Sequence, residues 1–306
     1  MTTVGFIGLG SMGMPMAHNL LAKGFTVQGF DVRSDSVAAL AVRGARPAAT
    51  AAAAAAGADA LVLMVVNAAQ AEQALLADGA LEALPDGSVV ILMATCPPGA
   101  VTALAARVEA AGRRFVDAPV SGGVVGAVAG SLSIMAAAPV AVVERVRPVL
   151  AAMGGKVFHV GGQPGQGATV KTVNQLLCGV HIAVVAEAFA LAAKVGVDLD
   201  ILLEIMSGSA ASSWMLKDRG PRMLHADPEI TSTVDIFVKD LGIVLEAGRD
   251  ARAALPLAAV AHQMFLATSG RGEGTTDDSQ VIRSYHALNG TNQESRPEPP
   301  DRLIQA

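Results

Sequence analysis

A glycine-rich turn near the N-terminus has the residue types and spacing of a dinucleotide site. Gly8, Gly10 and Gly13 form a G-x-G-x-x-G pattern that encloses Ser11 and Met12, with a short apolar run before it and a helical stretch after it. In this pattern the first glycine permits a tight turn, the second lets the backbone approach a pyrophosphate, and the third lets the helix pack closely on the strand. The free N–H groups at the helix start attract the phosphates. We therefore expect these five residues to bind a dinucleotide cofactor.

Asp31 bears on which nicotinamide cofactor fits this turn. It ends the next apolar run, 18 residues after Gly13. A carboxylate there accepts hydrogen bonds from the ribose 2′-OH of NAD and repels the 2′-phosphate of NADP. Arg33, two residues further on, is either a solvated loop charge or a guanidinium that receives that phosphate. We predict NAD, with NADP as the alternative.

A second group of chemically capable residues lies in the middle of the chain. Lys171, Asn174 and Gln175 follow the segment Gly165-Gln166-Gly167, and their spacing of three and four places them on one helical face. Earlier, Ser121-Gly122-Gly123 leaves a predicted strand for a loop of flexible residues, whose N–H groups can turn toward a substrate carboxylate. We expect Ser121, Gly122, Gly123, Asn174 and Gln175 to bind a substrate. A solvated helix charge is the alternative for Lys171 on spacing alone.

Two further residues are candidates for the cofactor site. Thr95 follows a predicted strand at the edge where dinucleotides bind, so we expect it to contact the nicotinamide end. Lys239 is expected to close over the cofactor, with an ion pair to Asp240 as the alternative. The six histidines show no metal-ligand spacing, so we expect no metal ion.

Short apolar runs alternate with helical stretches over the first half of the chain. Strands are predicted over 4–9, 26–31, 60–66, 89–95, 115–120 and 156–160, and helices over 14–23, 34–43, 51–56, 69–76, 99–111 and 139–153. This alternation predicts a doubly wound α/β domain of the Rossmann type over residues 1–163. Residues 164–290 are predicted to form an all-helical domain for substrate binding and dimerisation, which begins with a long helix over 168–195 that joins the two domains. Residues 291–306 are rich in proline and charge, so we expect a disordered tail.

Composition removes several classes of protein. The chain has 306 residues, a formal charge of −5 and 52% hydrophobic residues, which excludes a largely disordered chain and a basic nucleic-acid surface. Polar residues throughout the long apolar helix argue against a membrane span. Two cysteines and the lack of a basic N-terminal region indicate the cytoplasm. The stretch 182–191 has Glu187 as its one charge, so its apolar surface predicts a homodimer or homotetramer.

Taken in order, these segments resemble the β-hydroxyacid dehydrogenase family, which includes 3-hydroxyisobutyrate dehydrogenase and tartronate semialdehyde reductase. The resemblance covers roughly residues 4–288. It rests on Gly8–Gly13, Thr95 with Pro97, Asp117–Gly123 with Gly126 and Gly130, Gly167 to Lys171 with Asn174, and Lys239-Asp240. It implies a Rossmann domain, an all-helical C-terminal domain and a catalytic lysine at Lys171. That lysine is the general base toward the substrate hydroxyl in oxidation and the general acid in the reverse direction.

The sequence also departs from the commonest family pattern. Asn174-Gln175 stands where many members have two asparagines, and Val66-Asn67 stands where many have Leu-Pro. We count Val66 and Asn67 with the cofactor-binding residues. The stretch 175–182, with 213–215 and 234–241, is most similar to the L-threonate dehydrogenase branch, whose enzymes oxidise a four-carbon sugar acid at C2 with NAD.

The resemblance therefore implies NAD-dependent oxidation of L-threonate or a related four-carbon sugar acid. One alternative is a 3-hydroxyisobutyrate dehydrogenase, and another is an NADPH-dependent reductase of tartronate semialdehyde or succinic semialdehyde. A non-enzyme alternative is a catalytically silent binding module. Imine reductases share the architecture but replace the lysine, so Lys171 argues against them.

Overall fold

The computed structural model describes residues 2–291 of the chain. The chain divides into two compact units between residues 174 and 175. The expected boundary at 163–164 lies at the turn before helix α9 (Gln166–Lys194), whereas the division between the compact units falls within that helix. The tail expected over 291–306 lies outside the described residues except for Thr291.

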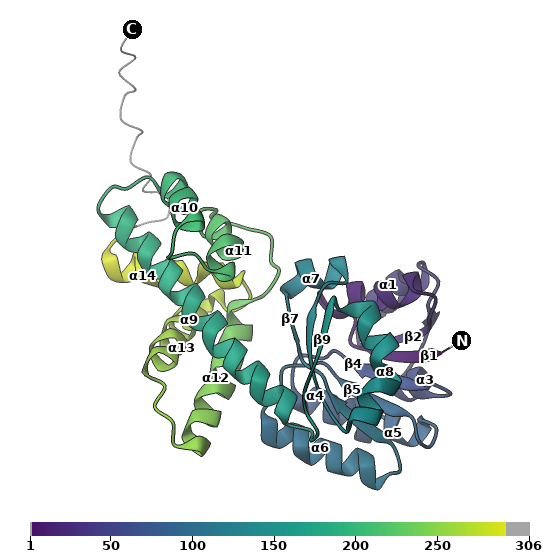
Figure 1. The fold of residues 1–306 in the computed structure, drawn as a ribbon. Helices are drawn as coiled ribbons and strands as arrows, with labels where there is room; N and C mark the ends of the chain where they lie inside the picture. Colours follow the sequence, from purple (N-terminus) through teal and green to yellow (C-terminus); the bar gives the residue numbers. More distant parts are fainter. Residues whose placement is uncertain (1, 292–306) are drawn as a thin grey trace. The chain divides into compact units, whose positions relative to one another are not determined.

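The first unit is built on one mixed sheet (Figure 1). Its described strands are β1 (Thr3–Ile7), β2 (Thr26–Phe30), β3 (Arg46–Pro47), β4 (Ala60–Leu63), β5 (Val89–Leu92), β6 (Arg114–Asp117), β7 (Val120–Ser121), β8 (Ser133–Ala137) and β9 (Lys156–Gly161). Six of them run parallel to one another, in the spatial order β3-β2-β1-β4-β5-β6. From β1 the chain first adds strands on one side of the sheet, and from β4 onward it adds them on the other side. This is the strand order of a dinucleotide-binding doubly wound fold, with its switch point between β1 and β4. The predicted fold class is confirmed.

The carboxyl ends of the parallel strands lie in register. Ile7 of β1 pairs with Phe30 of β2 and Leu63 of β4. Leu63 pairs with Leu92 of β5, which pairs with Asp117 of β6. The residues that follow these strand ends therefore share one edge of the sheet, which is the edge where such folds bind ligands.

Alternate residues of each strand face opposite layers of helices. Val62 and Ile91 lie in one buried cluster, whereas Leu61, Leu63 and Leu92 lie in the other. This period of two follows from strand geometry, and burial on both faces explains why the strands are continuous apolar runs. The first cluster is covered by α1 (Gly13–Ala22), α2 (Ser34–Ala41), α7 (Gly123–Ala129) and α8 (Val140–Met153). The second is covered by α3 (Ala51–Ala55), α4 (Ala68–Glu72), η1 (Gln73–Ala77), α5 (Ala80–Ala83) and α6 (Pro98–Ala110).

Four elements of this unit have no counterpart among the strands and helices expected from the sequence: β3, β8, α5 and α7. Strand β8 has the sequence SIMAA, and alanine is depleted in strands, so the run gives a weak local signal. Helix α7 has two glycines in seven residues and follows Gly122, so its sequence favours a loop. The expected loop is therefore limited to Gly122, which has a φ of +127°, and is wrong at Gly123, the first residue of the helix.

The second unit is helical. Besides most of α9, its described elements are α10 (Leu199–Gly208), α11 (Trp214–Met223), α12 (Val234–Ala251), α13 (Pro256–Thr268), η2 (Ser269–Glu273), η3 (Asp278–Val281) and α14 (Ile282–Asn289). Local capping defines two of the helix starts: Asp198 accepts hydrogen bonds from the first turn of α10, and Ser213 accepts one from Leu216 in α11. Pairing between β-strands is limited here, among the described residues, to a bridge between Thr233 and Asp277.

Helix α9 is long and apolar enough to cross a membrane by length and composition. One of its faces is buried in the core of the second unit, where Ile182, Ala186 and Phe189 pack against Leu241 and Phe265. The opposite face exposes residues at intervals of seven, which lie on one side of a helix: Leu177, Val184 and Leu191. The helical unit therefore covers part of the 182–191 stretch and leaves a narrower apolar surface than the sequence suggested.

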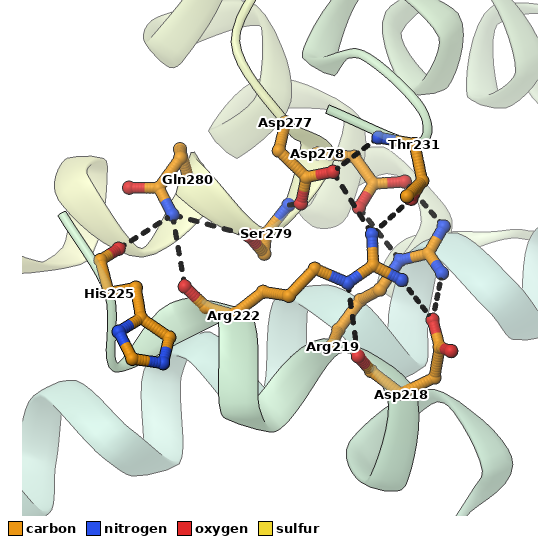
Figure 2. Close-up of polar contacts among 9 residues, drawn as sticks. All are labelled: Asp218, Arg219, Arg222, His225, Thr231, Asp277, Asp278, Ser279 and Gln280. Atoms are coloured by element: carbon orange, nitrogen blue, oxygen red, sulfur yellow. Dashed lines mark hydrogen bonds and ion pairs between the residues drawn. The ribbon is translucent and has the colours of Figure 1, made fainter. Parts of the chain in front are cut away.

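An ion-pair network ties α11 to the segment that precedes α14 (Figure 2). Arg219 donates two hydrogen bonds of 2.8 Å to the two carboxylate oxygens of Asp278, which is fully buried. Arg222 pairs with Asp277 at 3.0 Å, and Asp218 pairs with both arginines. Asp277 also accepts the N–H of Thr231 at 3.1 Å. The network therefore holds the chain segment that leads into α12.

Candidate active site

The glycine-rich turn lies between β1 and α1, beside the switch point of the sheet. Gly8 has a φ of +96°, which favours glycine. A Cβ on Gly13 would lie 1.9 Å from the Gly8 carbonyl oxygen, so the helix approaches the strand too closely for any side chain. The space at Gly10 is open, because a Cβ there would lie 3.8 Å from Arg33 Nη2, its nearest contact among the described residues. Ser11 is exposed and Met12 is half-buried at this surface.

The start of α1 has no side-chain cap among the described residues. Its N-cap position is Met12. The first N–H groups of a helix lack partners within the helix and carry its positive dipole end. The open space at Gly10 and the uncapped start of α1 therefore fit the pyrophosphate of a dinucleotide.

Asp31 follows β2 at the same edge of the sheet, and both of its carboxylate oxygens are engaged. Oδ2 accepts the N–H of Leu9 at 2.6 Å, while Oδ1 accepts the backbone N–H of Arg33 at 2.9 Å and its Nε at 3.2 Å. Burial alone would raise the pKa of Asp31, but these donors outweigh it and lower the pKa below its ordinary value. Asp31 is therefore an anion that fixes the glycine-rich turn, and it holds Arg33 beside that turn.

The next two strand ends carry the remaining predicted cofactor residues of this unit. Val66 and Asn67 follow β4, where Asn67 Oδ1 accepts the N–H of Gln70 at 2.9 Å and caps α4. The N–H of Val66 donates to Gln70 Oε1 at 2.9 Å, and the Val66 side chain is exposed. Thr95 is half-buried after β5. Because the strand ends are in register, these residues lie at the same edge as the glycine-rich turn.

Three predicted site residues come together around the first turns of α9. Ser121, in β7, donates a hydrogen bond of 3.2 Å from Oγ to Oδ1 of Asn174. Lys171 lies three residues before Asn174 on the helix and is 7% exposed. Residues three apart share a helical face, so the contact with Ser121 places the face that carries Lys171 toward β7. Gly122 and Gly123 continue directly from Ser121 into α7.

Gln175 and Lys239 are brought together in the second unit. The amide Nε2 of Gln175 donates to Oδ2 of Asp240, which is 2% exposed, and Lys239 Nζ pairs with the other oxygen of Asp240 at 2.6 Å. The alternative expectation for Lys239, an ion pair with Asp240, is therefore confirmed. A Cβ on Gly179 would lie 2.8 Å from the Leu241 side chain, so α9 and α12 cross closely beside this group.

Asp117 is a residue for which the sequence predicts no role beyond its place in a motif. Asp117 is the last residue of β6 and is 1% exposed, and its carboxylate contacts the start of α9. The signal that could have found it is a carboxylate at the end of the apolar run Phe115-Val116, where a buried charge requires partners. Among the described residues, no group of three or more His, Cys, Asp or Glu side chains is arranged to hold a metal ion.

Comparisons with known proteins agree with this arrangement. Residues 3–161 match the family described as the NAD binding domain of 6-phosphogluconate dehydrogenase. Residues 165–285 match the family described as NAD-binding of NADP-dependent 3-hydroxyisobutyrate dehydrogenase.

Full-length relatives are also similar to this chain. An L-threonate dehydrogenase of Cupriavidus necator is 44% identical over 286 residues, covering 93% of this chain and 96% of that protein. One of Escherichia coli is 40% identical over 287 residues, covering 93% and 95%. A crystal structure of 3-hydroxyisobutyrate dehydrogenase from Salmonella typhimurium has a TM-score of 0.88 and 42% identity, covering 92% of this chain and 99% of that one.

Proposed function

Because the chain belongs to the 3-hydroxyisobutyrate dehydrogenase-like family of NAD(P)-dependent hydroxyacid dehydrogenases, we propose that it oxidises L-threonate or a related four-carbon sugar acid with NAD, using Lys171 as the general base. The observation that carries this proposal is the hydrogen bond between Ser121 and Asn174. It joins a polar residue at the binding edge of the sheet to the helical face of Lys171. A proton acceptor and groups that orient a substrate are then available at one place.

Each residue of this group has a distinct role in the proposed reaction. Bound NAD supplies the acceptor for the hydride that leaves the substrate carbon. Lys171 Nζ takes the proton of the substrate hydroxyl, and it returns that proton when the reaction runs in reverse. Ser121 donates its own proton to Asn174, so its Oγ can accept a hydrogen bond from a substrate hydroxyl. The N–H groups of Gly122 and Gly123 bind the substrate carboxylate.

Asp31 supports NAD as the cofactor. Its carboxylate is ionised and lies at the end of β2. There it accepts a hydrogen bond from the ribose 2′-OH of NAD and repels the 2′-phosphate of NADP. Arg33, the alternative partner for a phosphate, pairs with Asp31 at 3.2 Å. Lys239, which is one-quarter exposed and paired with Asp240, contacts the cofactor in this proposal.

A polar four-carbon acid is favoured by the relatives named above, two of which are L-threonate dehydrogenases. The second candidate substrate is 3-hydroxyisobutyrate, because the similar Salmonella protein carries that name and so does the family matched by residues 165–285. The two substrates differ in polarity: threonate has three hydroxyl groups, whereas 3-hydroxyisobutyrate has one hydroxyl and a methyl group. The polar pair Ser121 and Asn174 favours the former.

The enzyme is soluble, with α9 as a core helix, and we propose that it acts in the cytoplasm as a homodimer or homotetramer. Residues 164–290 form the domain for substrate binding and dimerisation in this proposal. The apolar face of Leu177, Val184 and Leu191 supports association, since each of these side chains is more than half exposed in one chain. Burying such a face against a second copy removes apolar surface from water.

A substrate panel tests the proposal directly. Hydroxy acids of three to five carbons, L-threonate and 3-hydroxyisobutyrate among them, are each assayed with NAD and with NADP by the absorbance of the reduced cofactor. We expect L-threonate with NAD to give the highest kcat/KM. In the Lys171→Ala variant we expect kcat to fall about 10²-fold or more while NAD binding is nearly unchanged.

The Lys156→Ala variant is a matched control, because it removes an exposed lysine at the start of β9. Turnover near the wild-type value in Lys171→Ala would contradict the assignment of the general base. A preference for 3-hydroxyisobutyrate would select the second candidate substrate.

A further inference from the structure

The helix that carries Lys171 is capped by a residue from the sheet. Helix α9 begins at Gln166, and the N–H groups of its first turn need acceptors from outside the helix. The preceding residue, where a side chain commonly supplies an acceptor, is Gly165, which has none. Instead, Asp117 Oδ2 accepts the N–H of Gly165 at 2.9 Å and that of Ala168 at 2.8 Å. Asp117 thus provides the cap that the local sequence lacks.

The first turn of α9 lies directly on the end of β6 and the middle of β8. A Cβ on Gly167 would lie 2.6 Å from the carbonyl oxygen of Met135 in β8 and 2.8 Å from that of Asp117 in β6. There is no room for a side chain, and the Asp117 carboxylate is buried beneath the turn. Water cannot readily replace a buried acceptor, so removing this one leaves N–H donors without partners.

The surroundings of Asp117 make its charge sensitive to pH. Burial raises the pKa of Asp117 to about 6, although the N–H groups of Ala168, Gly165 and Gly167 oppose the rise. Its neighbouring strands β5 and β8 carry no charged residue. The charged residues on the other elements around it are Arg114 on β6, Arg107 and Glu109 on α6, Glu144, Arg145 and Arg147 on α8, and, in the first two turns of α9, Lys171.

We propose that Asp117 is a positioning residue for the dehydrogenase reaction, because its carboxylate fixes the first turn of α9 and so sets where Lys171 and Asn174 lie relative to Ser121. This inference rests on the proposed function. Lys171 follows Ala168 by three residues, a rise of about 4.5 Å along the helix, so a change in the first turn is passed directly to the lysine. A displacement of about 1 Å at a reacting group can lower a rate about 10²-fold.

Two variants separate the charge of Asp117 from its hydrogen bonds. Asp117→Asn keeps an acceptor oxygen without the charge, and Asp117→Ala removes both. The matched control is Asp59→Asn, since Asp59 also accepts a backbone N–H, from Thr3 at 2.8 Å, but precedes β4 at the opposite edge of the sheet.

Amide hydrogen exchange reports the cap without any need for catalysis. In peptides that cover residues 163–175 we expect exchange to be about tenfold faster in Asp117→Ala, as the loss of a helix cap predicts, and less affected in Asp117→Asn. Exchange elsewhere in the sheet and in the Asp59→Asn control should match the wild type. Unchanged exchange in both Asp117 variants would overturn the cap itself.

Kinetics report the positioning. We expect kcat to fall about 10²-fold in Asp117→Ala and about tenfold in Asp117→Asn, with the KM for NAD within about twofold of the wild type. Faster exchange combined with an unchanged kcat would overturn the positioning role while leaving the proposed function intact. A wild-type protein that oxidises no hydroxy acid would overturn the proposed function, and the exchange result would still stand.

The pH profile distinguishes positioning from a general loss of structure. It is measured in the direction of reduction, with NADH and the oxo acid formed from L-threonate, because Lys171 must then be protonated and cannot itself cause a loss at low pH. We expect the wild-type kcat to fall as the pH drops through about 6, where Asp117 becomes neutral, and Asp117→Asn to lack this step. A step of equal size in both proteins would refute the role of the Asp117 charge.

Discussion

Replacing Asp31 by alanine should move cofactor preference from NAD toward NADP, and the structure sets the size of the effect. An ionised carboxylate accepts about four hydrogen bonds, and the donors of Leu9 and Arg33 occupy three of these sites. One site is left for a ribose hydroxyl. A hydrogen bond to a charged group contributes about 1.5–3 kcal/mol, so its loss should weaken NAD use by about 10-fold to 150-fold.

NADP should gain from the same change. The substitution removes a negative charge from the place of the 2′-phosphate and releases Arg33, whose side chain is 62% exposed. Repulsion between charges about 4 Å apart near a protein surface is about 1–4 kcal/mol, and an exposed ion pair contributes at most about 1 kcal/mol. Taking the lower values, NADP use should improve about tenfold. The ratio of kcat/KM for NADP to that for NAD should then rise by about 10²–10³.

The ratio is the quantity to measure, because Asp31 also holds the N–H of Leu9 in the glycine-rich turn. Any loosening of that turn affects both cofactors and cancels in the ratio. Asp35→Ala is the matched control, since Asp35 is an exposed carboxylate in the first turn of α2. An unchanged ratio in Asp31→Ala, or a wild-type enzyme that already uses NADP as well as NAD, would refute this reasoning.

Two further predictions concern stability and assembly. Arg219→Met leaves the buried carboxylate of Asp278 without its bidentate partner, so urea unfolding should show a loss of about 3–5 kcal/mol, and the double variant with Asp278→Leu should recover most of it. A loss below about 1 kcal/mol in the single variant would contradict the importance of this pair. In light scattering at micromolar concentration the protein should have at least twice the 30.9 kDa mass of one chain, and Val184→Glu should return it to that mass by placing a charge on the exposed apolar face of α9. A monodisperse wild-type species near the mass of one chain would exclude the proposed assembly.

Much of the first unit could be predicted because its signals are local. The run before Gly8 and the helix after Gly13 lie within a few residues of each other, and a buried strand, a tight turn and a helix start each require particular residue types at short spacing. Strand β8 and helix α7 carry weak versions of these signals, since alanine disfavours a strand and glycine disfavours a helix. Pairing with neighbouring strands and burial decide β8, and neither is visible in its five residues.

In the candidate site, too, some features follow from local sequence and others depend on long-range contacts. The sequence by itself determined the glycine-rich turn, the carboxylate at Asp31 and the helical face of Lys171, because each depends on spacing along one strand or one helix. Only the tertiary structure decided that Asp117 caps a helix through an N–H group 51 residues further along the chain, that Ser121 meets Asn174, and that Asp240 binds both Gln175 and Lys239. The physical reason is that a buried polar group needs a partner, but its own sequence does not say which distant group the chain topology will bring within hydrogen-bond distance.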